Sequence, residues 1–372
     1  MKRLSKIICL SSLCLFLGGT SAKLYSDNRY AENFSIEQFS THRLLTITNP
    51  WRGSGNLSQT YALVSKEDAV PGLPSDVKII RTPVERIVIT STVYLGPVQT
   101  LGLHDKLAGV AYANLTNDAD VHQRIEDGRI TAIQGGAALD IETILKIRPD
   151  LILTSTSGDA VYDDHPRLER AGLPVVLTAG WMENHPLARS EWIKVIAAFV
   201  NKETQAENFF EGVAEKYEAL TNLTTSVKTK PTVFSNAPYG GVWHLPGGAS
   251  YNAQAFADAG AHYLWADDET AGGIPLDFEV ILFKAADADI WLNPGAHSSL
   301  ASLGSVDSRL SGFRAFREGN VFNNTVRVNT HGGNDIWERG INSPDEVLAD
   351  LIKIFHPDLL PDHQFIYYEQ LK

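Results

Sequence analysis

One pattern occurs twice in this chain, as Ile141-Glu-Thr-Ile-Leu-Lys-Ile-Arg-Pro-Asp-Leu-Ile-Leu153 and as Phe278-Glu-Val-Ile-Leu-Phe-Lys-Ala-Ala-Asp-Ala-Asp-Ile-Trp-Leu292. Each copy is a glutamate that opens a short amphipathic helix, followed by an acidic residue and an apolar strand. A helix–strand unit that is repeated in two halves predicts two similar lobes. Glu142 and Glu279 would then occupy matching exposed positions, one on each lobe. That arrangement suits docking onto a two-fold symmetric partner, whereas catalysis would require the two carboxylates to converge.

Strands and helices alternate around both copies, as expected for α/β lobes. In the first half, strands are predicted at 87–90, 107–111, 130–133, 151–154 and 174–177, and helices at 93–103, 139–147 and 166–171. In the second half, strands are predicted at 232–235, 290–292 and 326–328, and helices at 252–259, from Glu279 onward, and at 344–355. Two further strands, at 43–49 and 60–65, predict an N-terminal β-hairpin added to the first lobe.

The longest helical pattern begins near Ser190, and its apolar residues recur at three- and four-residue spacing as far as Leu220. No proline lies between Leu187 and Pro231. A helix of about 20 to 30 residues is about 30 to 45 Å long, which is enough to bridge two lobes. The alternative is ordinary core packing, with two helices that are broken near Asn201.

The first residues predict export. A basic start, an apolar run at 7–17 and small residues up to Ala22 are typical of a signal peptide that is cleaved after Ala22. Both cysteines, Cys9 and Cys14, lie inside this leader, so we expect no disulfide partner and no thiolate chemistry in the mature chain. Lipidation at Cys14 is the weaker alternative, because Leu13 precedes it where a small residue is needed.

The composition describes an acidic globular protein. Hydrophobic residues make up 44% of the 372 positions, which is enough for one large core or two medium ones. The net charge is −12, and loss of the three basic residues of the leader would leave 29 basic against 44 acidic residues, or −15. Nucleic acid is therefore not an expected partner, whereas a basic surface on a membrane protein is compatible with this charge.

Taken together, these segments resemble the substrate-binding proteins of ABC importers that capture iron–siderophore complexes and cobalamin. The resemblance is carried by 86–90, 101–103, 107–111, Gly135-Gly136, Glu142, 148–153, 168–177 and 279–292. It implies two Rossmann-like α/β lobes joined by a long rigid helix, with the solute in the cleft between them. The corresponding division is a signal peptide at 1–22, an N-terminal extension with the β-hairpin at 23–80, a first lobe at 81–186, a connecting helix at 187–225 and a second lobe at 226–372.

The resemblance also assigns the repeated glutamates. In that family, one exposed glutamate on each lobe contacts arginines on the two copies of the permease, and the motifs place these at Glu142 and Glu279. The alternative is that each is a first-turn carboxylate favoured by the helix dipole, which is worth about 0.3 to 1 kcal/mol. Both roles can hold together.

Loops that follow strands supply the candidate ligand residues, because open α/β sheets bind ligands at the carboxyl ends of their strands. The candidates are Tyr94, Tyr112, Trp181, Arg189, Tyr239, Trp243, Tyr251, His331, Trp337 and Arg339. Aromatic side chains give a large contact area that fits a bulky chelate or a corrinoid, with core packing as the alternative for each. The glycines near Tyr239 and Trp243 favour an irregular loop there, whereas Trp192 and Trp291 are expected in the core.

No resident metal, cofactor or catalytic residue is predicted. The 11 histidines are scattered and form no His-x-His or His-Glu-x-x-His pattern. A direct zinc or manganese site is the minority alternative, with His331 and His185 as its first candidates. The motifs of serine hydrolases, phosphate-binding loops and dinucleotide-binding proteins are absent, and no particular carboxylate pair indicates a glycosidase-type hydrolase.

We therefore expect a monomeric periplasmic binding protein of a Gram-negative bacterium, not an enzyme. It would carry a small-molecule metal chelate, an iron(III)–siderophore-type complex, to the permease and ATPase of an ABC importer. Cobalamin is the second choice of ligand. Arg52, Arg189 and Arg339 are the arginines that could converge on an anionic chelate. A secreted enzyme or receptor on the same fold is the remaining alternative.

Overall fold

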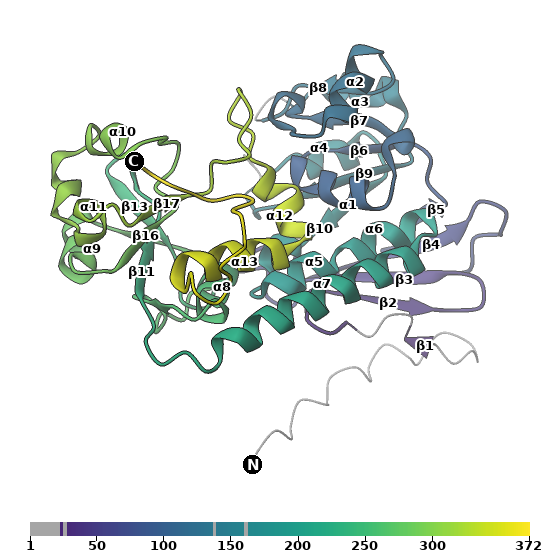
Figure 1. Cartoon of the computed structure of the whole chain (residues 1–372). Helices are drawn as coiled ribbons and strands as arrows, with labels where there is room; N and C mark the ends of the chain where they lie inside the picture. Colours follow the sequence, from purple (N-terminus) through teal and green to yellow (C-terminus); the bar gives the residue numbers. More distant parts are fainter. Residues whose placement is uncertain (1–22, 25–27, 137–138, 160–162) are drawn as a thin grey trace.

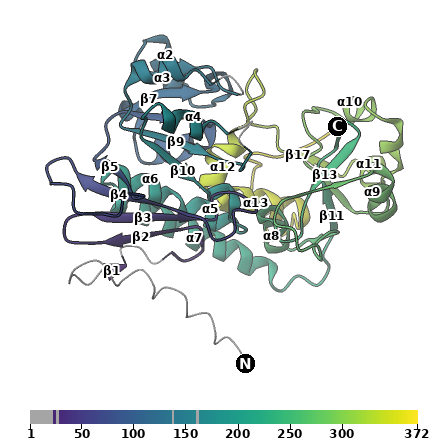
Figure 2. The ribbon, with the colours of Figure 1, turned by 180° about the vertical axis from the view of Figure 1, so that it is seen from behind.

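The computed structural model describes residues 23–24, 28–136, 139–159 and 163–372, so the predicted signal peptide lies outside the described residues. The chain forms two α/β lobes, an N-terminal β-sheet and a layer of helices that connects them (Figures 1 and 2). Within the described ranges, we find no helix that is both long and apolar enough to cross a membrane.

The first lobe is built on a parallel sheet with the strand order β10-β9-β6-β7-β8. Its strands are β6 (Ile87–Ile89), β7 (Leu107–Ala111), β8 (Thr131–Ile133), β9 (Leu151–Ser155) and β10 (Val175–Thr178). Its helices are α1 (Leu95–Thr100), α2 (Ala119–Glu126), α3 (Ile141–Ile147) and α4 (His165–Arg170). The central strands are buried on both faces, as is typical of parallel sheets, and this explains their continuous apolar runs.

The second lobe has the strand order β14-β11-β16-β17-β18, in which only β18 is antiparallel to its neighbour. The strands are β11 (Thr232–Ser235), β14 (His262–Tyr263), β16 (Ile290–Leu292), β17 (Val321–Asn323) and β18 (Glu369–Gln370). A smaller antiparallel sheet contains β12 (Pro238–Tyr239), β13 (Val242–Pro246) and β15 (Gly273–Leu276). The helices of this lobe are α8 (Tyr251–Asp258), α9 (Phe278–Ala285), α10 (Leu300–Gly304) and α11 (Arg314–Arg317).

Two expectations for this lobe are wrong. The segment around Tyr239 and Trp243 is not an irregular loop, because β13 pairs with β15 in a regular antiparallel ladder. The strand expected at 326–328 is a loop with one isolated bridge, between Val328 and Asn334, and the sheet strand is instead β17.

The connection between the lobes is three helices and not one long helix. They are α5 (Pro186–Glu191), α6 (Ile193–Val200) and α7 (Glu203–Thr224). Asn201 ends α6 with φ of 55°, a left-handed conformation that asparagine tolerates better than most residues, so the predicted alternative of a break at this position is confirmed. The 22 residues of α7 still span about 33 Å. The C-terminal helix α13 (Pro344–Phe355) packs along α7.

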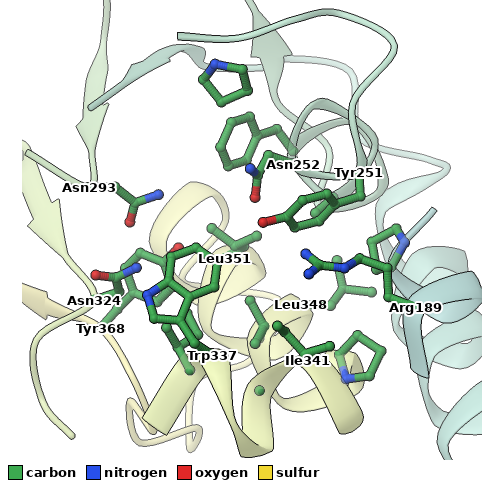
Figure 3. Close-up of a pocket in the computed structure, with 18 of the residues that line it drawn as sticks. Arg189, Tyr251, Asn252, Asn293, Asn324, Trp337, Ile341, Leu348, Leu351 and Tyr368 are labelled. Carbon is green, nitrogen blue, oxygen red and sulfur yellow. The ribbon is translucent and has the colours of Figure 1, made fainter. Parts of the chain in front are cut away.

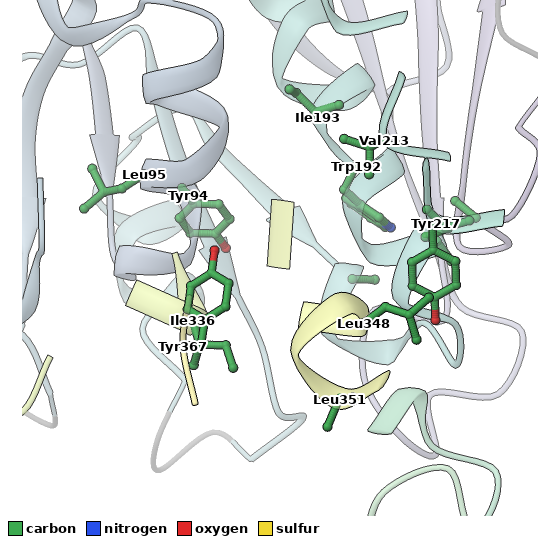
Figure 4. Packing of buried hydrophobic residues seen from close by; sticks show 14 of the residues in the cluster. Tyr94, Leu95, Trp192, Ile193, Val213, Tyr217, Ile336, Leu348, Leu351 and Tyr367 are labelled. Atoms are coloured by element: carbon green, nitrogen blue, oxygen red, sulfur yellow. The ribbon is translucent and has the colours of Figure 1, made fainter. Parts of the chain in front are cut away.

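The core is continuous from one lobe to the other. One cluster of buried apolar side chains includes Tyr94 of the first lobe, Trp192 and Tyr217 of the connecting helices, and Leu348 of α13 (Figure 4). Trp192 and Trp291 are buried, as predicted. Movement of one lobe against the other would therefore disturb a shared apolar core.

The N-terminal extension is a five-stranded sheet whose centre is the predicted hairpin. Its strands are β1 (Lys23–Leu24), β2 (Phe34–Gln38), β3 (Arg43–Thr48), β4 (Ser58–Ser65) and β5 (Lys78–Thr82). In Figures 1 and 2 this sheet lies alongside α6 and α7. Phe34 meets Trp192 edge-on at a ring separation of 5.1 Å, so the sheet shares the apolar core.

Two buried carboxylates fix the N-terminal segment to the connecting helices. Glu191, at the end of α5, accepts hydrogen bonds from the backbone N–H groups of residues 29–31 and pairs with the Lys194 ammonium at 3.0 Å. Glu183 accepts from the backbone N–H groups of residues 32–33. Because both side chains are buried, each carboxylate depends on these donors for its solvation.

Replacing Glu191 with alanine should therefore loosen the N-terminal sheet. The substitution leaves the Lys194 ammonium without its fully buried partner, a change that costs about 3 to 5 kcal/mol. We expect urea unfolding to report a loss of this order. Glu207→Ala is the matched control, because Glu207 pairs with the same lysine from a half-exposed position and should cost less than about 1 kcal/mol. Equal losses in the two variants would contradict the anchoring role of Glu191.

Candidate functional site

Two cavities lie at the carboxyl ends of the parallel strands, one against each lobe. The strand order reverses between β6 and β9 in the first sheet and between β11 and β16 in the second. Open α/β sheets bind ligands in the crevice outside such reversal points. The two cavities share Arg189 of α5 and Ile341 of α12 (Arg339–Asn342), so together they form one candidate solute cleft.

The larger cavity, of about 230 Å³, lies against the second lobe (Figure 3). An asparagine follows each of three neighbouring strands and lines it: Asn236 after β11, Asn293 after β16 and Asn324 after β17. Asn236 and Asn293 have φ of 65° and 53°, in the left-handed region that asparagine tolerates. The side-chain Oδ1 of Asn293 is buried and has no hydrogen-bond partner within the described structure. That oxygen is available to a donor on a solute.

Arg189 is the charged group at the junction of the cavities. Its guanidinium carbon lies 4.1 Å from the centre of the Tyr251 ring, a cation–π contact that holds the side chain in place (Figure 3). Its Nε is buried and lacks a hydrogen-bond partner among the residues described. A guanidinium presents several donors in a fixed plane and binds carboxylates and similar oxyanions well. Arg189 can therefore hold an anionic or oxygen-rich group at the centre of the cleft.

The smaller cavity, of about 150 Å³, lies against the first lobe. Its hydroxyl groups come from the ends of three strands, and its aromatic wall includes Tyr94 and Trp181. The Tyr94 hydroxyl is 2.8 Å from the Thr178 hydroxyl, and burial raises the pKa of Tyr94 to about 12. At neutral pH this wall is therefore uncharged.

Several of the predicted ligand residues meet in these cavities. They are Tyr94, Trp181, Arg189, Tyr251 and Trp337. The asparagines of the larger cavity were not among the predicted residues, although each follows its strand directly in the sequence. Asparagine after an apolar strand was a usable signal, because it is a residue type that turns the chain at the strand end and supplies both a donor and an acceptor.

The other predicted ligand residues lie elsewhere. Trp243 is fully buried and donates its indole N–H to the Ser235 carbonyl at 2.9 Å, so it packs in the core of the second lobe. Tyr239 is 86% exposed on β12, outside both cavities. The ring of Tyr112 covers Gly135, where a side chain would have no room. Arg339 forms an ion pair with Glu346.

His331 and His185 have separate surroundings. His185 caps α5, accepts the Leu187 N–H at 3.1 Å and stacks on Tyr30. His331 lies exposed in the loop after β17, and its backbone N–H donates a hydrogen bond to the Asn329 Oδ1. Across the described ranges, no group of three or more His, Cys, Asp or Glu side chains is placed to hold a metal ion.

The loop after β17 crosses from the second lobe to the first. The Asn329 amide donates to the Thr116 carbonyl at 2.8 Å, and the buried Glu338 carboxylate accepts the Asn117 N–H at 3.2 Å. Burial, with Asp335 nearby, raises the pKa of Glu338 to about 7. The protonation of this carboxylate is therefore coupled to contact between the lobes.

This contact predicts a pH dependence of stability. Between pH 4.5 and about 7, the folded state retains on Glu338 a proton that the unfolded state releases. The contribution of Glu338 to the unfolding free energy should therefore fall as the pH rises through this window, by about 3 kcal/mol. Glu338→Gln should flatten the dependence in urea unfolding at a series of pH values, and Glu318→Gln, an exposed control, should not. Parallel profiles for wild type and Glu338→Gln would contradict this coupling.

Glu142 and Glu279 lie in the first turns of α3 and α9, and their side chains are 80% and 75% exposed. Each has one local cation, Lys146 at 2.8 Å and Arg309 at 2.9 Å. Exposed ion pairs of this kind contribute at most about 1 kcal/mol. Cations from a partner could therefore replace them at little cost.

Comparisons with known proteins agree with this architecture. A family model described as periplasmic binding protein matches residues 87–324. An uncharacterized lipoprotein of Methanocaldococcus jannaschii is 25% identical over 354 residues, which cover 89% of this chain and 82% of the relative. A second uncharacterized protein of that organism is 22% identical over 292 residues. The match covers 74% of this chain and 83% of that relative.

Solved structures share the fold. A periplasmic heme binding protein from Pseudomonas aeruginosa matches with a TM-score of 0.56 at 20% identity, over 74% of this chain and 94% of the other. A protein of an ABC-type Fe3+-hydroxamate transport system from Saccharomonospora viridis matches with a TM-score of 0.55 at 15% identity, over the same shares. With the two α/β lobes and the cavities at their strand ends, the match over 87–324 shows that the chain belongs to the periplasmic binding protein family and has its solute-binding role.

Proposed function

We propose that this protein is the solute-binding component of an ABC importer and captures an iron(III)–siderophore-type complex between its lobes. The observation that carries the proposal is the pair of cavities that meet at Arg189, at the strand ends of both lobes. The proteins of similar fold that are named for heme and for Fe3+-hydroxamate transport support an iron-bearing solute.

The lining of the cleft is suited to a bulky chelate that is rich in oxygen. Tyr251, Trp337 and Trp181 offer flat apolar surface, and Arg189 and Asn293 offer one unused donor and one unused acceptor. A siderophore supplies all the ligands of its iron, so the protein needs only to recognise the outer surface of the complex. Hydroxamate and carboxylate oxygens on that surface are the natural partners of a guanidinium.

The proposal places the protein outside the cytoplasmic membrane, where such importers collect their solutes. The basic and apolar leader at 1–22 supports export. A relative that is named as a lipoprotein supports action at the outer surface of a membrane.

Tryptophan fluorescence of residues 23–372 tests the proposal. We expect a ferric hydroxamate to quench it saturably at micromolar concentration or below. Trp337, 44% exposed at the larger cavity, should be the main reporter, so Trp337→Phe should lose much of the signal. Arg189→Gln should weaken binding about tenfold or more, because hydrogen bonds to a charged group are worth about 1.5 to 3 kcal/mol.

Arg170→Gln, a surface change on α4, is the matched control and should bind like wild type. Saturable binding of cobalamin or haem alone would keep solute capture and change the nutrient. A response to free Zn²⁺ or Mn²⁺ alone would replace the chelate with a metal ion. No saturable change in fluorescence with any of these solutes would contradict the proposed function.

Docking through α3 and α9 is the second part of the proposal. Each helix adds an exposed apolar residue one turn after its glutamate, Leu145 at 44% exposure and Phe283 at 92%. Phenylalanine is enriched at protein interfaces, so the exposed Phe283 ring is compatible with a partner that covers this face of α9. The two helices lie on different lobes, far apart in Figure 1, so they suit a partner that presents the same surface twice.

Charge reversal tests the docking. The double variant Glu142→Arg with Glu279→Arg should abolish uptake through the cognate importer, because like charges would then face the permease arginines. Its solute affinity should stay at the wild-type value. The control Glu126→Arg with Glu318→Arg makes the same change in net charge at two other exposed positions and should import normally. Normal uptake by the first variant would contradict the assignment.

A further inference from the structure

The tip of the β3–β4 hairpin, residues 49–57, contacts both lobes. Trp51 lies against Gly158 in the loop after β9, where a Cβ would come within 2.2 Å of the indole ring. Arg52 lies against Gly272, next to β15 in the second lobe, where a Cβ would come within 1.9 Å of the guanidinium. Two consecutive residues of the tip therefore rest on opposite lobes, each on a glycine that leaves room for it.

The end of the hairpin that carries the tip is fixed through β2, because Phe34 pairs with Ile47 and Asn33 accepts the Thr48 N–H at 3.0 Å and the Asn49 side-chain amide at 3.2 Å. The residues before β2 are held by Glu191 and Glu183 at the connecting helices. The tip itself is a compact turn, in which the Asn49 N–H donates to the Leu57 carbonyl and the Ser54 N–H to the Trp51 carbonyl, both at 3.1 Å. The hairpin therefore reaches from the connecting helices to the two lobes as one ordered element.

The tip lines neither cavity itself but rests on two segments that adjoin them. Gly158 comes three residues after Ser155, which lines the smaller cavity. The Gly272 carbonyl accepts the N–H of Gly247 at 2.5 Å, and Gly247 follows Pro246, which lines the larger cavity. A solute that is bulky enough to extend from the cavities toward these two segments would meet the tip.

Arg52 brings positive charge to this rim. Its side chain is exposed, and no carboxylate in the described part of the chain pairs with it. Arg189, at the junction of the cavities, also lacks a carboxylate partner there, whereas Arg339 is neutralised by Glu346. In a chain of net charge −12, an unpaired arginine in the cleft and a second one on the segment that adjoins it favour a solute that carries negative charge.

We propose that the β3–β4 tip is a third wall of the solute cleft and that Arg52 contacts the solute and selects for an anionic group, such as a free carboxylate on an iron(III) chelate. The inference rests on the proposed function, because it requires a solute between the lobes. Trp51 holds the tip on the first lobe, and the Gly272 surface aligns the Arg52 guanidinium with the second. The N-terminal sheet is then part of the binding site as well as of the scaffold.

The test compares two solutes that differ in charge, ferric citrate and a neutral ferric trihydroxamate, by equilibrium fluorescence titration. Arg52→Gln should weaken the binding of ferric citrate about tenfold or more and change that of the neutral complex less than twofold. Gly272→Ala should act in the same direction, because the new methyl group displaces the guanidinium and keeps its charge. Lys228→Gln, an exposed change between α7 and β11, is the control and should alter neither affinity.

The outcomes separate this inference from the proposed function. If wild type binds ferric citrate and Arg52→Gln binds it equally well, the selective role of Arg52 is overturned while solute capture stands. If wild type binds neither chelate nor haem nor cobalamin, the proposed function fails and this inference fails with it. A loss of both affinities in Arg52→Gln, with Gly272→Ala unchanged, would also overturn the inference, because it would indicate a general structural effect.

The wall can also be tested without removing Arg52. Because the only cysteines are Cys9 and Cys14, residues 23–372 contain no native thiol. The pair Trp51→Cys with Gly158→Cys is designed to join the tip to the first lobe on oxidation, and the reduced double variant controls for the strain that a side chain brings to Gly158, whose φ is 82°. We expect the oxidised protein to release bound chelate at least tenfold more slowly than the reduced protein. Equal release rates would overturn the assignment of the tip as a wall.

Discussion

The buried carboxylate of Glu191 is the interaction on which the arrangement of the cleft depends. It ends α5, the short helix that carries Arg189 two residues earlier, and it binds three successive backbone N–H groups of the N-terminal segment. A carboxylate that is removed from water is stable only where donors and a cation replace its hydration. This requirement fixes α5 to the N-terminal sheet. One buried charge thereby positions the central arginine of the cleft and the hairpin that reaches its rim.

The cleft itself leaves polar groups unused. Buried donors and acceptors without partners cost about 1 to 3 kcal/mol each, and the Arg189 Nε and the Asn293 Oδ1 are both in this state. A folded protein tolerates such groups where a ligand can satisfy them. The free energy lost in the empty cleft is then recovered on binding, and a solute without the matching oxygen and donor cannot recover it. Specificity follows from this difference in addition to shape.

Local sequence patterns predicted much of the fold. Features that depend on contacts between residues distant in sequence could not be predicted in this way. The strand at 107–111 and the helix at 344–355 lie at the predicted positions, because each depends on its own periodicity. Trp243 was assigned to a loop. Its strand pairs with β15, about 30 residues later, and the sequence around Trp243 contains no pattern that indicates this pairing. Tyr94, Trp181, Arg189, Tyr251 and Trp337 line the cavities, and the contact with a solute that strand-end reasoning predicted for them stays a prediction. The contacts of Trp51 and Arg52 could not be predicted, because they join three parts of the chain that are distant in sequence.

The apolar core that runs through both lobes has a mechanical consequence. Cores of this kind are close-packed and deform little, and the loop after β17 and the hairpin tip add further cross-links between the lobes. A cleft that is already ordered loses little conformational entropy when it fills. The helices α3 and α9 then keep nearly the same separation in the empty and the loaded protein. A partner that contacts both helices therefore meets the same spacing whether or not the cleft holds a solute, so it can sense a bound solute only through groups that contact the solute directly.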